Sequence, residues 1–350
     1  MKRARHAFTI WELVAVIAVL LTVIAVFLPA IAMNRRAARE LKDGTQIRGI
    51  HQAMITWSGQ SFGEFPSPGS LDHSDTIPGI DTSDNPRLKT RKNLPRWSLS
   101  MMVYLGFMTP EVLVSPAEVH PAIRVNTTFQ MSNPTAIAPS KRSRAFLDPS
   151  FAAYPDEPGG DTPIIGGGGT APAAGTSYSF VAFAGHRRAA WDVTFDRTQA
   201  VIANRGPWYS QDATYNWSLN RKDRRGAKRV LASESNTLLM HGSRTAWEGN
   251  VACNDGSVSF EMRPDPEYMP LFPQWFGGSQ GNSRRTRYDN LFANENEDSD
   301  TAVYTSADDD ITEATNTRRN NYLRCYGDRA MRRFDEKTGQ LVALGGFWHD

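Results

Sequence analysis

The stretch that decides the fold is Phe8 to Met33, which reads FTIWELVAVIAVLLTVIAVFLPAIAM. It is apolar apart from Thr9, Glu12, Thr22 and a few small residues. About 20 such residues, at 1.5 Å per residue, cross the hydrocarbon layer of a bilayer, and a helix satisfies every backbone polar group there. We therefore predict a transmembrane helix over residues 8–33, which anchors the rest of the chain.

The two flanks of this span differ little in charge. Both are basic, with Lys2, Arg3 and Arg5 before the span and Arg35, Arg36, Arg39 and Lys42 after it. The positive-inside rule therefore does not decide the orientation. The leader, residues 1–7, is short enough to stay inside, whereas the long remainder is rich in Trp, Tyr, Gly and Pro, as translocated domains often are. We predict a cytoplasmic N-terminus and an extracytoplasmic body.

Glu12 is the one carboxylate within the span. A carboxylate at the centre of a spanning helix costs about 2.5–3.5 kcal/mol on insertion scales, and less near the interface. A carboxylate inside a membrane span therefore usually has a specific function. The alternative is a protonated or snorkelling Glu at the level of the headgroups.

The run Ala7-Phe8-Thr9-Ile10-Trp11-Glu12-Leu13 resembles the prepilin cleavage and methylation signal of type IV pilins and pseudopilins. The resemblance implies that a prepilin peptidase cuts between Ala7 and Phe8, that the new amine of Phe8 is methylated, and that Glu12 acts in assembly. Pro29 stands where such helices often kink, since proline removes a helical hydrogen bond. The family usually has Gly before the cut, and here the residue is Ala7.

The same resemblance implies a function and a location. The chain would be a non-enzymatic structural subunit of a type II secretion system or a type IV pilus-like filament, in the bacterial inner membrane with its body in the periplasm. Its partners would be other pilin-like subunits, the prepilin peptidase and an inner-membrane assembly platform. The alternative is a tethered extracytoplasmic binding or hydrolytic domain that does not polymerise.

A secretory signal is a rival reading of the same segment. Ala30-Ile31-Ala32 fits a small-residue cleavage site, and cleavage there would release a free secreted enzyme. The apolar run is longer than the usual 7–15 residues of such signals, and it contains Glu12. Both observations favour the membrane helix.

Beyond the span, residues 34–62 are predicted to continue the helix. Apolar residues recur there mostly at steps of three and four: Ala37, Leu41, Ile47, Ile50, Met54 and Trp57. This stripe is expected to pack on the sheet of the body, as in a pilin. Pro66, Pro68 and Gly69 then break the helix, and the body covers residues 63–350.

The fold class predicted for the whole chain is α+β: a long N-terminal transmembrane helix packed on an antiparallel sheet with long loops, as in pilins. A short helix is expected at 95–107 and a flexible Gly-rich loop at 155–176. Strands are expected at 177–184, 199–203, 237–241, 250–253 and 257–262, with Asn254-Asp255-Gly256 as a hairpin turn.

Three segments of the body and helix look like parts of large bacterial pseudopilin-like proteins. They are Leu41 to Gln46, Asn204 to Pro207, and His241 through Trp247 to Val258. His241 beside Ser243 suggests hydrolysis, but a Gly-x-Ser-x-Gly motif is missing, and Gly256 is explained by the turn alone. The structural interpretation of the element is favoured.

Charge and cysteine content limit the other classes of function. The 39 Lys and Arg balance 37 Asp and Glu, so nucleic acid is an unlikely partner, and the basic run at 221–229 reads as a surface loop. Cys253 and Cys325 could form a single disulfide in an oxidising compartment. Asp298, Asp300 and Asp308 are weak candidates for calcium, because Thr301 and Ala307 stand where an EF-hand needs Gly and Glu. No other cofactor is expected.

Overall fold

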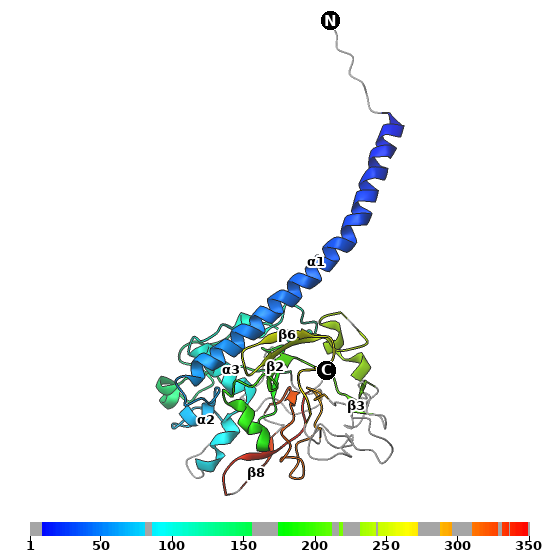
Figure 1. Cartoon of the computed structure of the whole chain (residues 1–350). Helices are drawn as coiled ribbons and strands as arrows, with labels where there is room; N and C mark the ends of the chain where they lie inside the picture. Colours follow the sequence, from blue (N-terminus) through cyan, green and yellow to red (C-terminus); the bar gives the residue numbers. More distant parts are fainter. Residues whose placement is uncertain are drawn as a thin grey trace, which may run out of the picture.

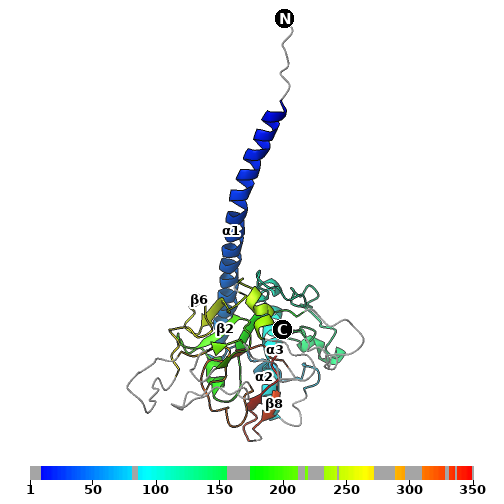
Figure 2. The same cartoon turned by 90° about the vertical axis from the view of Figure 1, so that its right-hand side faces the viewer.

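The computed structural model describes residues 9–80, 86–155, 174–211, 217–219, 232–242, 244–271, 288–295, 310–327, 331–335 and 337–348. A helix of 49 residues, α1 (Ile10–Ser58), projects from a body built on a β-sheet (Figure 1). The outer half of α1 extends well beyond the body, and its inner half lies along it (Figure 2). The prediction of a mixed α+β fold with a long N-terminal apolar helix is confirmed.

The main sheet of the body has five strands in the order β6-β5-β2-β1-β7. Each neighbouring pair is antiparallel. The strands are β1 (Tyr178–Val181), β2 (Ala200–Asn204), β5 (Gly249–Cys253), β6 (Val258–Glu261) and β7 (Leu323–Arg324). The antiparallel sheet predicted from the sequence is therefore confirmed, with β7 as an unexpected edge.

Short elements surround this sheet. Two further two-stranded sheets pair β3 (Ser210–Gln211) with β4 (Trp217–Ser218) and β8 (Met331–Phe334) with β9 (Leu341–Leu344). The remaining helices are α2 (Pro68–Leu71), α3 (Pro95–Tyr104) and the 3-10 turns η1 (Pro86–Lys92), η2 (Pro110–Leu113), η3 (Pro139–Arg144), η4 (Gly185–Trp191), η5 (Ala232–Glu234) and η6 (Asn236–Leu239).

The hairpin of β5 and β6 forms as the sequence predicts. Asn250 pairs with Phe260, and Ala252 pairs with Val258. The turn between them closes because Gly256 has a φ of +85°, a conformation in which a glycine carries no steric penalty. The Asp255 carboxylate accepts hydrogen bonds from the N–H and hydroxyl of Ser257. The turn needs no chemistry to explain its sequence.

Two predictions for local structure are wrong. Residues 237–241 do not form a strand, because the Ser235 hydroxyl accepts a hydrogen bond from Thr237 N–H and starts the 3-10 turn η6 instead. The helix predicted at 95–107 ends earlier, at Tyr104, where Gly106 takes a φ of +80°. The predicted Gly-rich loop at 155–176 lies largely outside the described residues, as does the basic run at 221–229.

The inner half of α1 is part of the core. Its buried positions lie on one side of the helix, as expected for a helix lying on a sheet: Asp43, Ile47, Ile50, His51, Ala53, Met54, Trp57 and Ser58. The predicted stripe began too early, since Ala37 and Leu41 are exposed. The first fully buried side chain of α1 is Asp43, two residues after Leu41.

The predicted disulfide is not formed. Cys253 lies in β5 and Cys325 directly follows β7, and β2 and β1 run between those strands. Three strand spacings of about 4.8 Å separate the two positions, which is far more than the distance a disulfide spans. Burial raises the pKa of the Cys253 thiol to about 12, so it is not reactive.

Candidate functional site

The outer half of α1 is apolar and exposed on all sides. From Ile10 to Met33, each large apolar side chain is open to solvent. This helix is long and apolar enough to cross a membrane. It is continuous through Pro29, whose missing N–H leaves the carbonyl of Ala25 without its helical donor, and Figure 1 shows a gradual curve along its length.

The first turn of α1 is closed by a capping box. Thr9 donates its backbone N–H and its hydroxyl to the Glu12 carboxylate, at 2.8 and 2.9 Å. In return the Thr9 hydroxyl oxygen accepts the Glu12 N–H at 3.3 Å. Glu12 therefore has a local structural role that sequence reasoning missed, although a Thr three residues before a Glu is the sequence signature of this cap. Ala7 and Phe8 lie outside the described residues.

A buried polar network joins the inner half of α1 to the sheet. Asp43 accepts hydrogen bonds from the Tyr178 hydroxyl on Oδ1 at 3.0 Å and from Asn250 Nδ2 on Oδ2 at 2.7 Å. His241 Nε2 lies 3.5 Å from the same Oδ2. The neighbouring Gln46 donates to the carbonyl of Glu111 at 3.0 Å. One helix turn is thus hydrogen-bonded to β1, β5 and η2, and the segment after η6 lies beside it.

The charge of Asp43 is stabilised by these partners. Burial by itself raises the pKa of this carboxyl, but hydrogen bonds from His241, Ser115 and Asn250 outweigh it, so the pKa is lowered. Tyr178 shows the opposite effect, since burial and the charge of Asp43 raise the pKa of its phenol well above the usual range. The network therefore holds an ionised Asp43 and a neutral Tyr178 at neutral pH.

His241 lies inside this joint. It is buried, and its ring meets Phe260 edge-on at 5.2 Å between centroids. The neighbouring Ser243 lies outside the described residues. With Asp43 on one side and Phe260 on the other, His241 completes the joint between helix and sheet.

Residues from the segments 41–46, 204–207 and 241–258 meet at this joint. Gly44 lies so close to Asn250 that an added Cβ would be 2.9 Å from its Oδ1. Asn250 N–H in turn donates to Asn204 Oδ1 at 2.7 Å, and Trp247 Nε1 donates to the Arg205 carbonyl at 2.8 Å. No local pattern indicates that these segments are neighbours in space.

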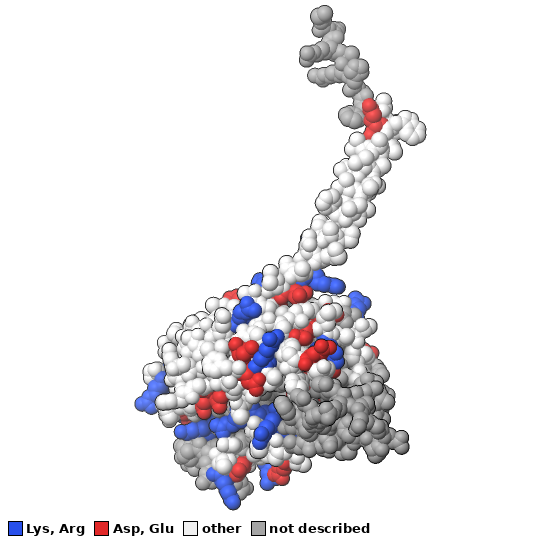
Figure 3. Space-filling model, viewed as in Figure 1, with Lys and Arg blue, Asp and Glu red and all other residues white. Residues whose placement is uncertain are grey.

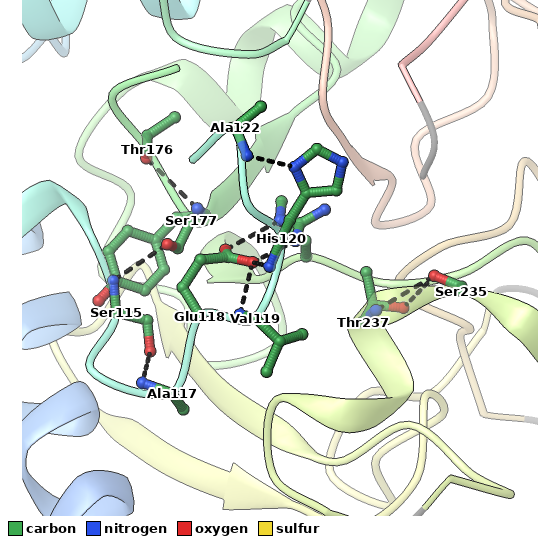
Figure 4. A network of polar contacts seen from close by, with 12 residues as sticks. Ser115, Ala117, Glu118, Val119, His120, Ala122, Thr176, Ser177, Ser235 and Thr237 are labelled. Atoms are coloured by element: carbon green, nitrogen blue, oxygen red, sulfur yellow. Dashed lines mark hydrogen bonds and ion pairs between the residues drawn. The ribbon is translucent and has the colours of Figure 1, made fainter. Parts of the chain in front are cut away.

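A buried ion pair lies beside the joint. Arg205 Nη2 is 2.7 Å from Glu118 Oε1, and both side chains are almost fully buried. The Glu118 carboxylate also accepts the backbone N–H groups of Val119 and His120, which Figure 4 shows folded around it. These contacts fix the loop after η2 against the end of β2.

A polar cavity of about 600 Å³ lies near the far end of α1. Glu64 and Asp192 face each other across a bridge between the segments 63–65 and 191–193. Burial and the charge of Glu64 raise the pKa of Asp192, while Arg188 lowers it. The other walls include Phe183, His186, Gln199, Arg319 and Gln340. The sequence carried no signal for this cavity, because its lining comes from distant segments.

Metal sites are not apparent in the part of the chain that the structure describes, where no group of three or more His, Cys, Asp or Glu side chains is placed to hold an ion. The weak calcium candidates Asp298, Asp300 and Asp308 lie outside the described residues.

Comparison of this chain with protein-family models, with curated proteins and with solved structures finds no match.

Proposed function

We propose that this chain is a pilin-like structural subunit that inserts its outer helix in the bacterial inner membrane and polymerises through that helix. Its periplasmic body would then be carried on the filament of a type II secretion or type IV pilus-like system. In this proposal the prepilin peptidase cuts between Ala7 and Phe8, and an inner-membrane platform adds the subunits. No enzymatic role is proposed.

The observation that carries the proposal is the division of α1 into two halves. The outer half has no contact with the body and exposes its apolar side chains around the whole circumference. Such a surface needs lipid or other apolar helices around it. A tether needs lipid only, whereas a filament core needs lipid before assembly and neighbouring helices after it.

The joint around Asp43 supports the same role. A body that hangs on a flexible linker would not keep a fixed direction relative to its helix. Here Asp43 and Gln46 are bonded to three parts of the body, and Ile47 and Ile50 are fully buried against it. The helix and body therefore move as one piece, which is what a regular polymer requires of its subunit.

Glu12 would have different roles in a filament subunit and in a membrane tether. In assembly, the carboxylate of one subunit would meet the new ammonium of Phe8 on the next in a medium of low dielectric, where either charge alone is costly. In a tether, the same carboxylate would serve only the capping box with Thr9. The two roles can be separated by substitution.

The test compares three variants at matched levels in the membrane fraction. Glu12→Leu removes both roles, Glu12→Gln keeps an acceptor oxygen for the cap but removes the charge, and Thr9→Ala removes the cap but keeps the carboxylate. Filaments are then sheared from the cells, or cross-linked in place, and quantified.

If Glu12 acts in assembly, both Glu12 variants lose polymer by more than about tenfold, since an unpaired buried ion costs several kcal/mol. Thr9→Ala should assemble nearly as the parent does. Equal polymer from the parent and Glu12→Gln would refute the assembly role and favour the tether.

A further inference from the structure

The end of the body that faces the span can be located from the contacts of β5 and β6. At the start of β5, Asn250 bonds to Asp43 and to the carbonyl of Glu40. At the other end of the hairpin, Asp255 lies near His51, eight residues further along α1. These eight residues correspond to about 12 Å of helix. The start of β5 and the end of β6 therefore point toward the span.

Basic side chains gather at this end. Arg35, Arg36, Arg39 and Lys42 follow the span directly, and all four are exposed. Arg244 adds a fifth exposed cation from the loop after η6, where Gly242 touches the guanidinium of Arg36. Among the described residues, none of the five forms an ion pair. Figure 3 shows basic side chains on both sides of the point where α1 enters the body, with acidic ones among them.

Exposed apolar side chains accompany these cations. Leu41 on α1 is 75% exposed, Leu239 in η6 is 39% exposed, and Met262 at the end of β6 is 71% exposed. Leu239 immediately precedes the loop that contacts Arg36, and Met262 follows the strand end that points toward the span. A soluble surface gains nothing from this arrangement, whereas a surface at the interface of a bilayer does.

We propose that this collar, formed by the five cations and the three apolar side chains, docks the body on anionic phospholipid headgroups. The inference rests on the proposed insertion of α1 in the membrane. Arg35 and Arg36 stand two and three residues beyond Met33, at headgroup level, and long basic side chains reach phosphates from there. Leu41, Leu239 and Met262 would enter the interface beside them.

Docking would give the body a fixed tilt before it joins a filament. The joint at Asp43 makes the helix and body one piece, so contact of the collar with the headgroups sets the angle of α1 in the bilayer as well. Each basic residue near an anionic surface adds about fivefold to the association. Glu40, on the same stretch of helix, subtracts from it.

The experiment places a fluorophore on the collar of the full-length chain. Cys253 and Cys325 are replaced by alanine, and Met262→Cys is labelled and reconstituted in phosphatidylcholine vesicles with or without phosphatidylglycerol. Quenching by a lipid with a spin label on its headgroup reports contact. We expect at least about threefold more quenching with the anionic lipid, lost at high salt and in the variant Arg35→Gln, Arg36→Gln, Arg39→Gln.

The matched control removes three exposed cations from distant parts of the body, Arg91→Gln, Arg144→Gln and Lys337→Gln, and should quench as the parent does. Carbonate extraction of the same vesicles separates the two claims. If the chain resists extraction but quenching ignores lipid charge, salt and the collar variant, docking is refuted and the span stands. If carbonate releases the chain, the span fails and the docking fails with it.

Discussion

The two halves of α1 belong to one unbroken helix but to two different environments. The inner half, from Asp43 onward, is buried on its sheet-facing side although it carries Asp43, His51 and Ser58. The outer half, before Asn34, is far more apolar and touches no other element. The less apolar half of this helix is therefore the half that the body buries.

The difference between the two halves shows which features of α1 allow it to pack on the body. In the inner half, a buried polar group can be matched by the body, as when Asp43 meets Tyr178 and Asn250. The outer half offers only apolar side chains, each of which would gain about 1.5–3 kcal/mol on leaving water. Since the body leaves all of them exposed, their environment in the cell must be something other than this body.

The largest expected effect is therefore on solubility, when the outer half is removed. A chain that begins at Asn34 keeps Asp43 and the whole buried face of α1, so its body should fold and remain monomeric without detergent. The full-length chain should need detergent or lipid. Size-exclusion chromatography and thermal unfolding by circular dichroism measure both. A truncated chain that aggregates or does not melt cooperatively would show that the two halves are not independent.

Breaking the joint is the next largest effect. Asp43→Ala leaves the Tyr178 hydroxyl and the Asn250 amide without their acceptor, and we expect a loss of about 3 kcal/mol in the free energy of unfolding. Urea denaturation of the chain from Asn34 measures it. Glu40→Ala, three residues away, is the control, and should change stability by less than about 0.5 kcal/mol. Similar losses from both would mean that the network does not hold the helix.

His51, in the buried half of α1, should make the free energy of unfolding depend on pH. Burial lowers the pKa of His51 to about 4, with Asp255 acting in the opposite direction, so the unfolded chain binds a proton first as the pH falls below 6.5. The contribution of neutral His51 to the free energy of unfolding is therefore fully present above pH 6.5 and is lost as the pH falls from 6.5 to 4. From pH 7 to pH 5 the loss should be about 2 kcal/mol.

His51→Leu provides the comparison for that measurement. Both imidazole nitrogens of His51 are buried without a hydrogen-bond partner among the described residues, so an apolar side chain should be tolerated. Urea midpoints are measured at pH 5 and pH 7 for parent and variant. The variant should show a smaller difference between the two pH values, and an unchanged difference would assign the pH dependence to other groups.

The smallest effect concerns the hairpin that packs on the inner half. Gly256→Ala introduces a Cβ that meets no atom within 4 Å, so the cost is that of a positive φ alone, about 1 kcal/mol. Asp255→Asn should cost less, because an amide oxygen still accepts from Ser257. Thermal unfolding of both variants tests the structural role of this turn.

Local pattern was sufficient to predict much of this fold. The long N-terminal helix and the strands β1, β2, β5 and β6 all show in runs of apolar residues bounded by Gly or turn residues. The strand predicted at 237–241 failed because Ser235 caps a 3-10 turn there. The edge strand β7 has two residues, too few to leave a pattern.

The sites were less predictable because they depend on tertiary contacts. Glu12 could be selected as a carboxylate in an apolar run, and its cap could be read from Thr9 three residues earlier. Asp43, by contrast, looks like any helical carboxylate until β1 and β5 surround it. Glu64 and Asp192 are more than a hundred residues apart and meet only in the fold.

In the proposed filament, neighbouring copies cover the outer half of α1, and cysteine cross-linking along that half detects such neighbours. In a chain with Cys253→Ala and Cys325→Ala, single cysteines are placed in turn at positions 13–28 and oxidised in membranes. We expect cross-linked dimers at a subset of positions that recurs about every 3.6 residues, and we expect Glu12→Gln to abolish them. Absence of cross-links throughout, in chains that are inserted in the membrane, would contradict the proposed filament and identify the helix as a tether.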